Sequence, residues 1–186
     1  MTQEEVVAGV IDVLDSLGIV YMVAGSFASN FHGAPRMTQD ADLVVDLDEP
    51  TALRLVHALE GDFYVSEDAA REAVLLRRLF NAIHLETGFK VDLVVKKSRP
   101  FSDAELVRRV SGTLAGRSVH FTSAEDTVLS KLEWSRNSGS HRQLDDARMV
   151  LRVQGARLDW TYLETWADDL GVRDLLERAR RADPPD

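Results

Sequence analysis

Two stretches of the sequence decide the fold: DADLVV at residues 40–45 and KVDLVV at residues 90–95. Both are rich in β-branched residues, which is typical of β-strands. Side chains two residues apart project from the same face of a strand, so Asp40 and Asp42 point the same way. A neighbouring strand can bring Asp92 beside them. The two stretches therefore predict three carboxylates at one place on a β-sheet.

Three carboxylates that meet repel one another unless a cation is present. Their hard oxygen atoms suit Mg²⁺, which binds few carboxylates and leaves coordination positions open for phosphate groups. We therefore expect Asp40, Asp42 and Asp92 to be metal ligands that hold a metal-bound triphosphate. Mg²⁺ is the expected metal and Mn²⁺ the second choice. The alternative is an acidic strand edge with a structural purpose only.

A Gly-Ser turn at Gly25 and Ser26 separates a predicted buried strand, residues 19–24, from a predicted short helix, residues 27–31. Glycine lets the backbone approach a ligand closely, and free N–H groups at a helix start bind anions. The serine hydroxyl adds a further donor. The turn is therefore a candidate phosphate-binding site, and the alternative is a plain turn with Ser26 as the helix N-cap.

Composition excludes several classes of site. The 186 residues contain no cysteine, which excludes disulfides, zinc-thiolate sites and thiol nucleophiles. The net charge of −9 and pI near 5.0 disfavour non-specific binding to nucleic acid, although a local basic groove is compatible with them. The first residues are acidic and polar, and no apolar run approaches the roughly 20 residues that span a bilayer. We expect a cytoplasmic protein without a signal peptide or membrane segment.

The periodicity of apolar residues divides the chain into an α/β core, residues 1–122, a helical portion, residues 123–182, and a frayed tail, residues 183–186. No element is assigned between residues 66 and 78. Predicted strands are residues 19–24, 41–46, 63–65, 79–86, 89–95 and 118–121. Predicted helices are residues 3–17, 27–31, 50–60, 104–110, 123–136, 141–154, 160–170 and 172–181.

The order of these motifs resembles the signature of the nucleotidyltransferase superfamily, which has the DNA polymerase beta-like fold. Gly25-Ser26 is followed by thirteen residues, then by Asp-Ala-Asp-Leu at residues 40–43, and later by Val-Asp-Leu at residues 91–93. The resemblance covers roughly residues 5–97. It implies an α+β fold with a mixed β-sheet flanked by helices, followed by a C-terminal helical portion.

The helical portion carries a second resemblance. The stretches SAED at residues 123–126, KLEW at residues 131–134 and RQLDD at residues 142–146 are similar to C-terminal motifs of bacterial small nucleotidyltransferases. That group includes abortive-infection and toxin–antitoxin toxins, so a cognate antitoxin is a possible partner. The alternative is structural: Arg142 pairs with an aspartate at helical spacing, and Lys131 lies exposed. Both interpretations stay open.

The superfamily resemblance implies a reaction. A nucleoside monophosphate passes from a nucleoside triphosphate (NTP) to an acceptor hydroxyl or phosphate, and pyrophosphate leaves. Two metal ions would be held by Asp40, Asp42 and Asp92, which are the implied catalytic residues, and Asp92 would also serve as a base. Two such ions stabilise the attacking and leaving oxygens of the displacement.

The resemblance also implies nucleotide-binding residues. Gly25 and Ser26 would contact the triphosphate, and Lys131 would add a point charge. Arg36 and Thr38 could line the nucleotide site, but a role in fixing their loop is the stronger interpretation. Aromatic side chains could stack a base, although their helical spacing is more typical of a core. These are Phe31, Trp134, Trp160 and Trp166.

The sequence leaves the acceptor open between RNA such as tRNA, protein and small molecules. A toxin and an enzyme that modifies a drug or metabolite are equally compatible with the motifs. The NTP and the oligomeric state are open as well. The competing hypothesis is a module with the same fold that binds a nucleotide or a partner without turnover.

Overall fold

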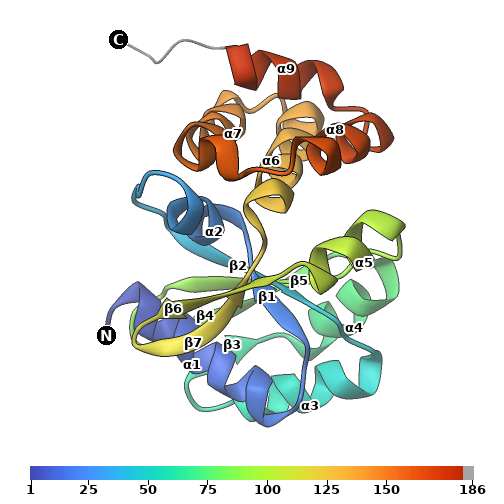
Figure 1. Cartoon of the computed structure of the whole chain (residues 1–186). Coiled ribbons are helices and arrows are strands. Elements are labelled where there is room, and N and C mark those ends of the chain that lie inside the picture. Colours follow the sequence, from blue (N-terminus) through green and yellow to red (C-terminus); the bar gives the residue numbers. More distant parts are fainter. Residues whose placement is uncertain (182–186) are drawn as a thin grey trace. The chain divides into compact units, whose positions relative to one another are not determined.

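The computed structural model describes residues 1–181 (Figure 1). Within them the strands form a single seven-stranded sheet in the order β3-β4-β5-β2-β1-β7-β6. The strands are β1 (Tyr21–Val23), β2 (Asp40–Val45), β3 (Phe63–Val65), β4 (Leu79–His84), β5 (Lys90–Val95), β6 (Val110–Leu114) and β7 (Arg117–Phe121). The helices are α1 (Gln3–Ser16), α2 (Gly25–His32), α3 (Glu49–Leu59), α4 (Glu67–Leu76), α5 (Pro100–Val107), α6 (Ala124–Ser138), α7 (His141–Gln154), η1 (Gly155–Arg157), α8 (Trp160–Asp169) and α9 (Arg173–Arg181).

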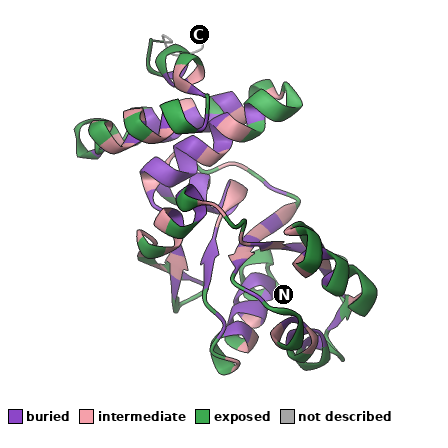
Figure 2. Ribbon diagram, turned by 90° about the vertical axis from the view of Figure 1, so that its right-hand side faces the viewer, coloured by how far each residue is buried: buried purple, intermediate pink, exposed green. Residues whose placement is uncertain are grey.

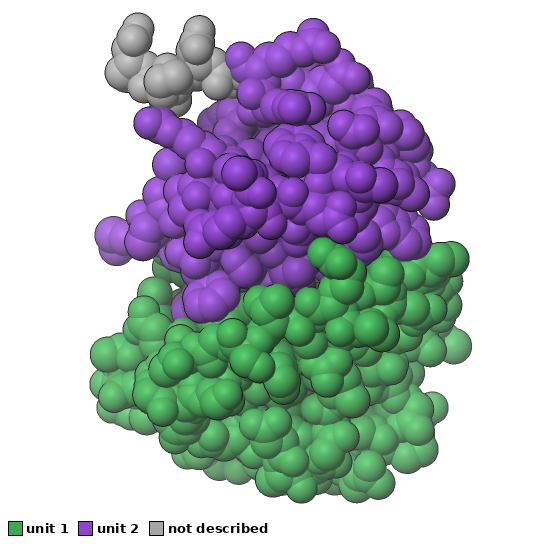
Figure 3. Space-filling model, viewed as in Figure 1, with its two compact units in different colours: residues 1–24, 38–121 green, residues 25–37, 122–186 purple. Residues whose placement is uncertain are grey.

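The chain folds into two compact units, which Figure 3 colours separately. The first unit comprises residues 1–24 and 38–121 and contains the sheet with α1, α3, α4 and α5. The second unit comprises residues 25–37 and the described residues from 122 onward, which form α2 and α6 to α9. The predicted tail, residues 183–186, lies outside the described residues.

The sheet of the first unit is mixed, as expected. β2 runs parallel to β5 and antiparallel to β1, and β1 runs parallel to β7. The β4–β5 and β6–β7 pairs are antiparallel hairpins. The expected α+β architecture, a mixed sheet with helices followed by a helical portion, is confirmed.

The pairing of β2 with β5 sets the chemistry of each face of the sheet. Six residue pairs run in parallel register from Asp40 opposite Lys90 to Val45 opposite Val95. Because side chains alternate, one face of this pair takes only apolar residues, and all of them are buried. They are Ala41, Leu43, Val45, Val91, Leu93 and Val95. The opposite face therefore carries every aspartate of the two strands. Figure 2 shows buried residues along the strands and along one side of the helices.

Helix starts follow the sequence signals. Thr2 and Glu5 form a capping box at the start of α1. Asp48 caps α3, which has a proline in its first turn. Ser123 accepts a hydrogen bond from the backbone N–H of Asp126 and caps α6.

Two parts of the first unit differ from the prediction. The helix predicted at residues 104–110 is α5, which begins earlier, at Pro100, and ends at Val107. Val110 instead begins β6, because a tight turn at Ala115 and Gly116 folds β6 back onto β7. Both turn residues have positive φ, 47° and 77°, which is typical of a two-residue hairpin turn. The helix α4 lies in a segment to which no element was assigned.

No helix among residues 1–181 combines the length and apolar character needed to cross a membrane.

We predict that Gly33→Ala destabilises the second unit, where the chain leaves α2 and passes close to α7. An added Cβ would lie 2.8 Å from the carbonyl oxygen of Ser29 and 3.3 Å from a methyl carbon of Val150. Moving backbone atoms away from the added Cβ costs free energy, so the free energy of unfolding should fall by about 1–3 kcal/mol. Urea unfolding followed by circular dichroism measures it.

Gly9→Ala is the control, because nothing lies within 4 Å of the added Cβ inside α1. Alanine is a better helix former than glycine, so this variant should gain roughly 0.5–1 kcal/mol. Equal unfolding midpoints for Gly33→Ala and the unchanged protein would contradict the close approach.

Candidate functional site

Three aspartates of the first unit share one face of the sheet. Asp42 lies directly opposite Asp92 in the parallel β2–β5 pair, and Asp40 lies opposite Lys90. On the other side of β5, Asn81 of β4 lies opposite Asp92. We call these five residues the carboxylate cluster. The register therefore brings together residues from three strands, including the three aspartates that the sequence predicted to share a face.

Asp92 is held through both carboxylate oxygens. The Asn81 side-chain amide donates to its Oδ1 at 2.6 Å, and the Lys90 ammonium donates to its Oδ2 at 2.9 Å. Lys90 Nζ also lies 3.8 Å from Oδ2 of Asp40. The hydrogen bond to Asp92, together with the charges of Asp92, Asp40 and Asp42, raises the pKa of Lys90 although partial burial opposes this. Lys90 therefore keeps its charge and offsets the repulsion among the aspartates.

Thr38 fixes the chain just ahead of β2. Its hydroxyl donates to the backbone carbonyl of Asp40 at 2.9 Å and lies 3.3 Å from Oδ1 of the same residue. Its own carbonyl accepts from the Gln3 side chain at 3.1 Å. In this structure Thr38 orients Asp40, which agrees with the loop-fixing interpretation; its predicted contact with a nucleotide stays a prediction.

The chemistry of the carboxylate cluster suits a hard divalent cation, because its three acids offer only oxygen donors. Among residues 1–181, no three His, Cys, Asp or Glu side chains are gathered in the arrangement of a metal site. The positive charge that contacts Asp40 and Asp92 here is the ammonium of Lys90. Which side chains bind metal stays a prediction.

The second unit contains a polar cluster of its own, formed by Ser26, Arg36, Lys131 and Asp146. Arg36 donates to both carboxylate oxygens of Asp146, from Nε at 2.7 Å and from Nη2 at 2.6 Å. Nη2 also donates to the hydroxyl of Ser26 at 2.8 Å. Lys131 donates to Oδ2 of Asp146 at 2.8 Å. We call these four residues the cationic cluster, since two positive charges share one carboxylate.

The cationic cluster is largely withdrawn from water. Lys131 and Asp146 are buried, so the interpretation of Lys131 as an exposed residue is wrong. Burial raises the pKa of Asp146, but hydrogen bonds from Arg36 and Lys131 outweigh it and lower that pKa below its ordinary value. Asp146 therefore stays ionised and fixes the positions of both cations.

The loop between α2 and β2 is anchored by the same arginine. The Asn30 side chain accepts from the backbone N–H of Arg36 at 3.1 Å and donates to its carbonyl at 2.8 Å. At the other end of α2, Gly25 has a φ of +56°, a conformation that favours glycine. Arg36 thus has the loop-fixing role considered from the sequence.

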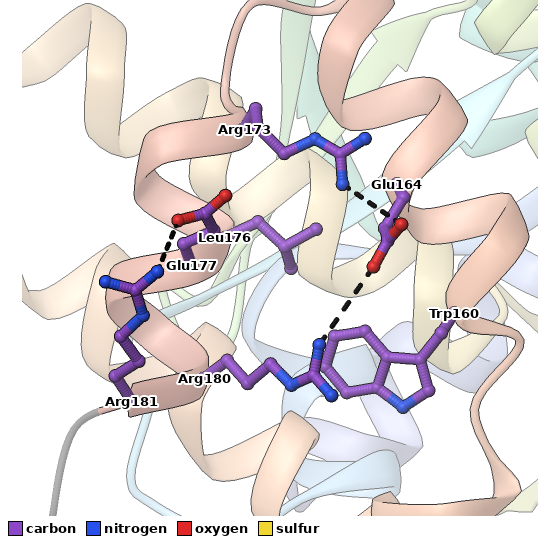
Figure 4. Close-up of a pocket in the computed structure, with 7 residues that line it drawn as sticks. All are labelled: Trp160, Glu164, Arg173, Leu176, Glu177, Arg180 and Arg181. Atoms are coloured by element: carbon purple, nitrogen blue, oxygen red, sulfur yellow. Dashed lines mark hydrogen bonds and ion pairs between the residues drawn. The ribbon is translucent and has the colours of Figure 1, made fainter.

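Two aromatic residues considered for base stacking are exposed rather than in a core: Phe31 at 44% and Trp134 at 58%. Trp160 lines a hollow of about 390 Å³ between α8 and α9 (Figure 4). The Arg180 guanidinium lies 4.3 Å from its ring centre. The arginines lining the hollow pair with Glu164 or Glu177, so each of them already contacts an acid of the helix pair.

Sequence reasoning missed Lys90, Asn81 and the pairing of Arg36 and Lys131 with Asp146. Lys90 precedes Asp92 by two residues, and the two-residue period of a strand places both side chains on one face. That signal was available. Asn81 depends on the register of the β4–β5 hairpin, and Asp146 lies 110 positions from Arg36, so neither has a local signal.

No protein-family model matches the sequence, and a search of the curated proteins finds no significant match. Solved structures match over nearly the whole chain. The antibiotic-resistance factor ANT(2'')-Ia superimposes with a TM-score of 0.62 at 13% identity, covering 95% of this chain and 97% of that one. An antigenic nucleotidyltransferase-like protein from Paracoccidioides brasiliensis gives 0.61 at 22% identity, covering 97% and 92%. The lincosamide antibiotic adenylyltransferase LnuA gives 0.55 at 12% identity, covering 82% and 98%.

These likenesses concern the fold. The chain has the α+β fold of solved nucleotidyltransferases, and the resemblance to that superfamily is confirmed at this level. At such low identities, fold alone does not decide the reaction.

We predict that Asp146→Asn strongly destabilises the second unit. The variant leaves the buried Lys131 ammonium and the Arg36 guanidinium without their carboxylate, and breaking a buried pair costs about 3–5 kcal/mol. Asp145→Asn is the control, because Asp145 is exposed and pairs with Arg148 in its own helix. It should change the free energy of unfolding by less than about 1 kcal/mol.

The same pair of variants has an expected pH dependence. Because the folded-state pKa of Asp146 lies below the ordinary value of 3.8, its stabilisation is complete above that pH. It is lost as the pH falls through the folded pKa. The stability gap between the unchanged protein and Asp146→Asn should therefore narrow in acid. A gap that stays constant in acid, or an equal loss in Asp145→Asn, would contradict the assigned network.

Proposed function

We propose that this chain is a metal-dependent nucleotidyltransferase. It moves a nucleoside monophosphate from an NTP to a hydroxyl group of a small-molecule acceptor and releases pyrophosphate. One observation carries the proposal: Asp42 and Asp92 lie opposite each other on one sheet face, with Asp40 beside them, in a chain with the nucleotidyltransferase fold. The test is the release of pyrophosphate.

In this proposal Asp40, Asp42 and Asp92 bind Mg²⁺ or Mn²⁺. When bound, such ions neutralise charge that develops on the attacking and leaving oxygens. Asp92 also accepts the proton of the incoming hydroxyl, as a positioned carboxylate can. Asn81 donates to Oδ1 of Asp92 at 2.6 Å and thereby orients this carboxylate.

The cationic cluster is the proposed triphosphate-binding part. Arg36 and Lys131 both contact the carboxylate of Asp146, and a guanidinium and an ammonium are the groups that bind phosphate in proteins. Asp146 holds Arg36 in a two-point contact, so the guanidinium is oriented before a phosphate arrives. Ser26 and the start of α2 at Gly25 add donors. Transfer of this kind needs positioning and charge neutralisation more than covalent help.

A small-molecule acceptor is favoured over nucleic acid by charge, since a net charge of −9 repels a polyanion. The solved relatives point the same way. One structure of ANT(2'')-Ia contains adenylyl-2''-tobramycin, and it superimposes on this chain with a TM-score of 0.59 at 17% identity. The LnuA structure contains lincomycin. ATP is accordingly the first NTP to test. A toxin that modifies RNA, with a cognate antitoxin, is the competing form of the same reaction.

We predict that the purified chain releases pyrophosphate from ATP with Mg²⁺ when aminoglycosides or lincosamides are supplied. The double variant Asp40→Asn, Asp42→Asn should lower the rate by at least about 10²–10³, as loss of essential electrostatic stabilisation does. Glu72→Gln, an exposed acid on α4, is the control and should keep the full rate.

The alternatives give different results in this assay. Nucleotide labelling of total RNA in place of the small molecules would favour the toxin. ATP binding without pyrophosphate release from any acceptor would favour the module without turnover. Pyrophosphate release that persists in the double variant would contradict the catalytic role assigned to Asp40 and Asp42.

Arg36→Lys tests the triphosphate role of the cationic cluster. Lysine keeps the charge but cannot contact Asp146 and Ser26 in the fork geometry of a guanidinium. We expect the Kd of a non-hydrolysable ATP analogue, measured by calorimetry, to rise roughly tenfold, the equivalent of one charged hydrogen bond. Arg54→Lys, exposed on α3, should leave that Kd unchanged. Equal affinities for both variants would exclude Arg36 from the nucleotide site.

A further inference from the structure

Lys90 occupies a distinctive position in the carboxylate cluster. It lies on β5 two residues before Asp92, and opposite Asp40 on β2. Its ammonium is 2.9 Å from Oδ2 of Asp92 and 3.8 Å from Oδ2 of Asp40. One flexible side chain therefore contacts two of the three acids that the proposed function assigns to metal binding.

The contacts of Asp92 leave little room for a second cation. Oδ1 of Asp92 accepts from the neutral amide of Asn81, and Oδ2 accepts from Lys90. A Mg²⁺ ion binds carboxylate oxygen at about 2.0–2.1 Å. An ion bound at Oδ2 would lie within a few ångströms of the ammonium, and two positive charges at that separation repel strongly.

The ammonium of Lys90 is also able to move away from Asp92 and Asp40. Its side chain is 39% exposed and its four-carbon stem is flexible, so the ammonium can move into water without unfolding the strand. Asp92, by contrast, is buried and fixed by Asn81. The lysine can therefore move away from this position more easily than Asp92 can.

We propose that Lys90 is a tethered cation that competes with the divalent metal ion for Asp92 and Asp40. In the metal-free protein its ammonium offsets part of their negative charge, and it withdraws when the metal ion binds. Lys90 thereby weakens the binding of free metal ions and holds the cluster together without them. This inference rests on the proposed function, since it takes the three aspartates to be metal ligands.

The test uses Mn²⁺ alone, without nucleotide, and measures its Kd by electron paramagnetic resonance. Lys90→Met removes the competing charge and should bind Mn²⁺ at least on the order of tenfold more tightly than the unchanged protein. Lys90→Arg keeps a cation at the position, so it should bind Mn²⁺ as weakly as the unchanged protein does. Lys96→Met removes the same charge just beyond β5, where Lys96 contacts Asp103 and Asp46, and should bind like the unchanged protein.

A second measurement needs no substitution at Lys90. Acylation of lysines by a water-soluble ester, followed by peptide mass spectrometry, reports how free each amine is. Adding Mn²⁺ should increase the acylation rate of Lys90 over the range that saturates the site, while Lys96 serves as the internal reference. This keeps the proposal testable if Lys90→Met does not fold.

The outcomes separate this inference from the proposed function. If Mn²⁺ binds and Asp42→Asn abolishes that binding, the metal site stands. Unchanged or weaker binding by Lys90→Met, or protection of Lys90 by Mn²⁺, would then overturn the competition alone. If neither the unchanged protein nor Lys90→Met binds Mn²⁺ in a way that depends on Asp42, the assigned metal site fails and the competition with it.

Discussion

The parallel register between β2 and β5 is the constraint on which the candidate chemistry depends. One face of the pair consists of buried apolar side chains, and the other carries Asp40, Asp42 and Asp92. A slip of one residue in either strand would exchange its two faces and move aspartates into the core. Burying an unpaired carboxylate is very costly. Burial of the apolar face thus fixes the register of the two strands and, with it, the positions of the three aspartates.

Each unit pairs the charges of its cluster in its own way. In the carboxylate cluster the ammonium of Lys90 contacts Asp92 and Asp40. In the cationic cluster Arg36 and Lys131 both contact Asp146. Carboxylate oxygens are the ligands that a hard divalent cation prefers, and guanidinium and ammonium groups are the partners that phosphate prefers.

Much of the fold could be predicted from the sequence, because the elements with strong periodicity or clear caps are the ones found. α4 was missed because its buried face consists of the small residues Ala70 and Ala73 rather than of large apolar side chains. β6 was missed because its stretch VSGTL has few β-forming residues and depends on its pairing with β7. For the candidate site, the aspartates and Lys131 had motif signals, whereas Asn81 had none.

By itself the sequence determined that Asp40 and Asp42 point the same way, that Asp92 lies on a similar strand, and that Gly25 begins a turn. These are local properties, since the period of a strand and the freedom of glycine act within a few residues. Only the tertiary structure decided that Lys90 lies opposite Asp40 and that Arg36 meets Asp146 across 110 positions. Such contacts depend on how distant elements pair, and local periodicity carries no information about that.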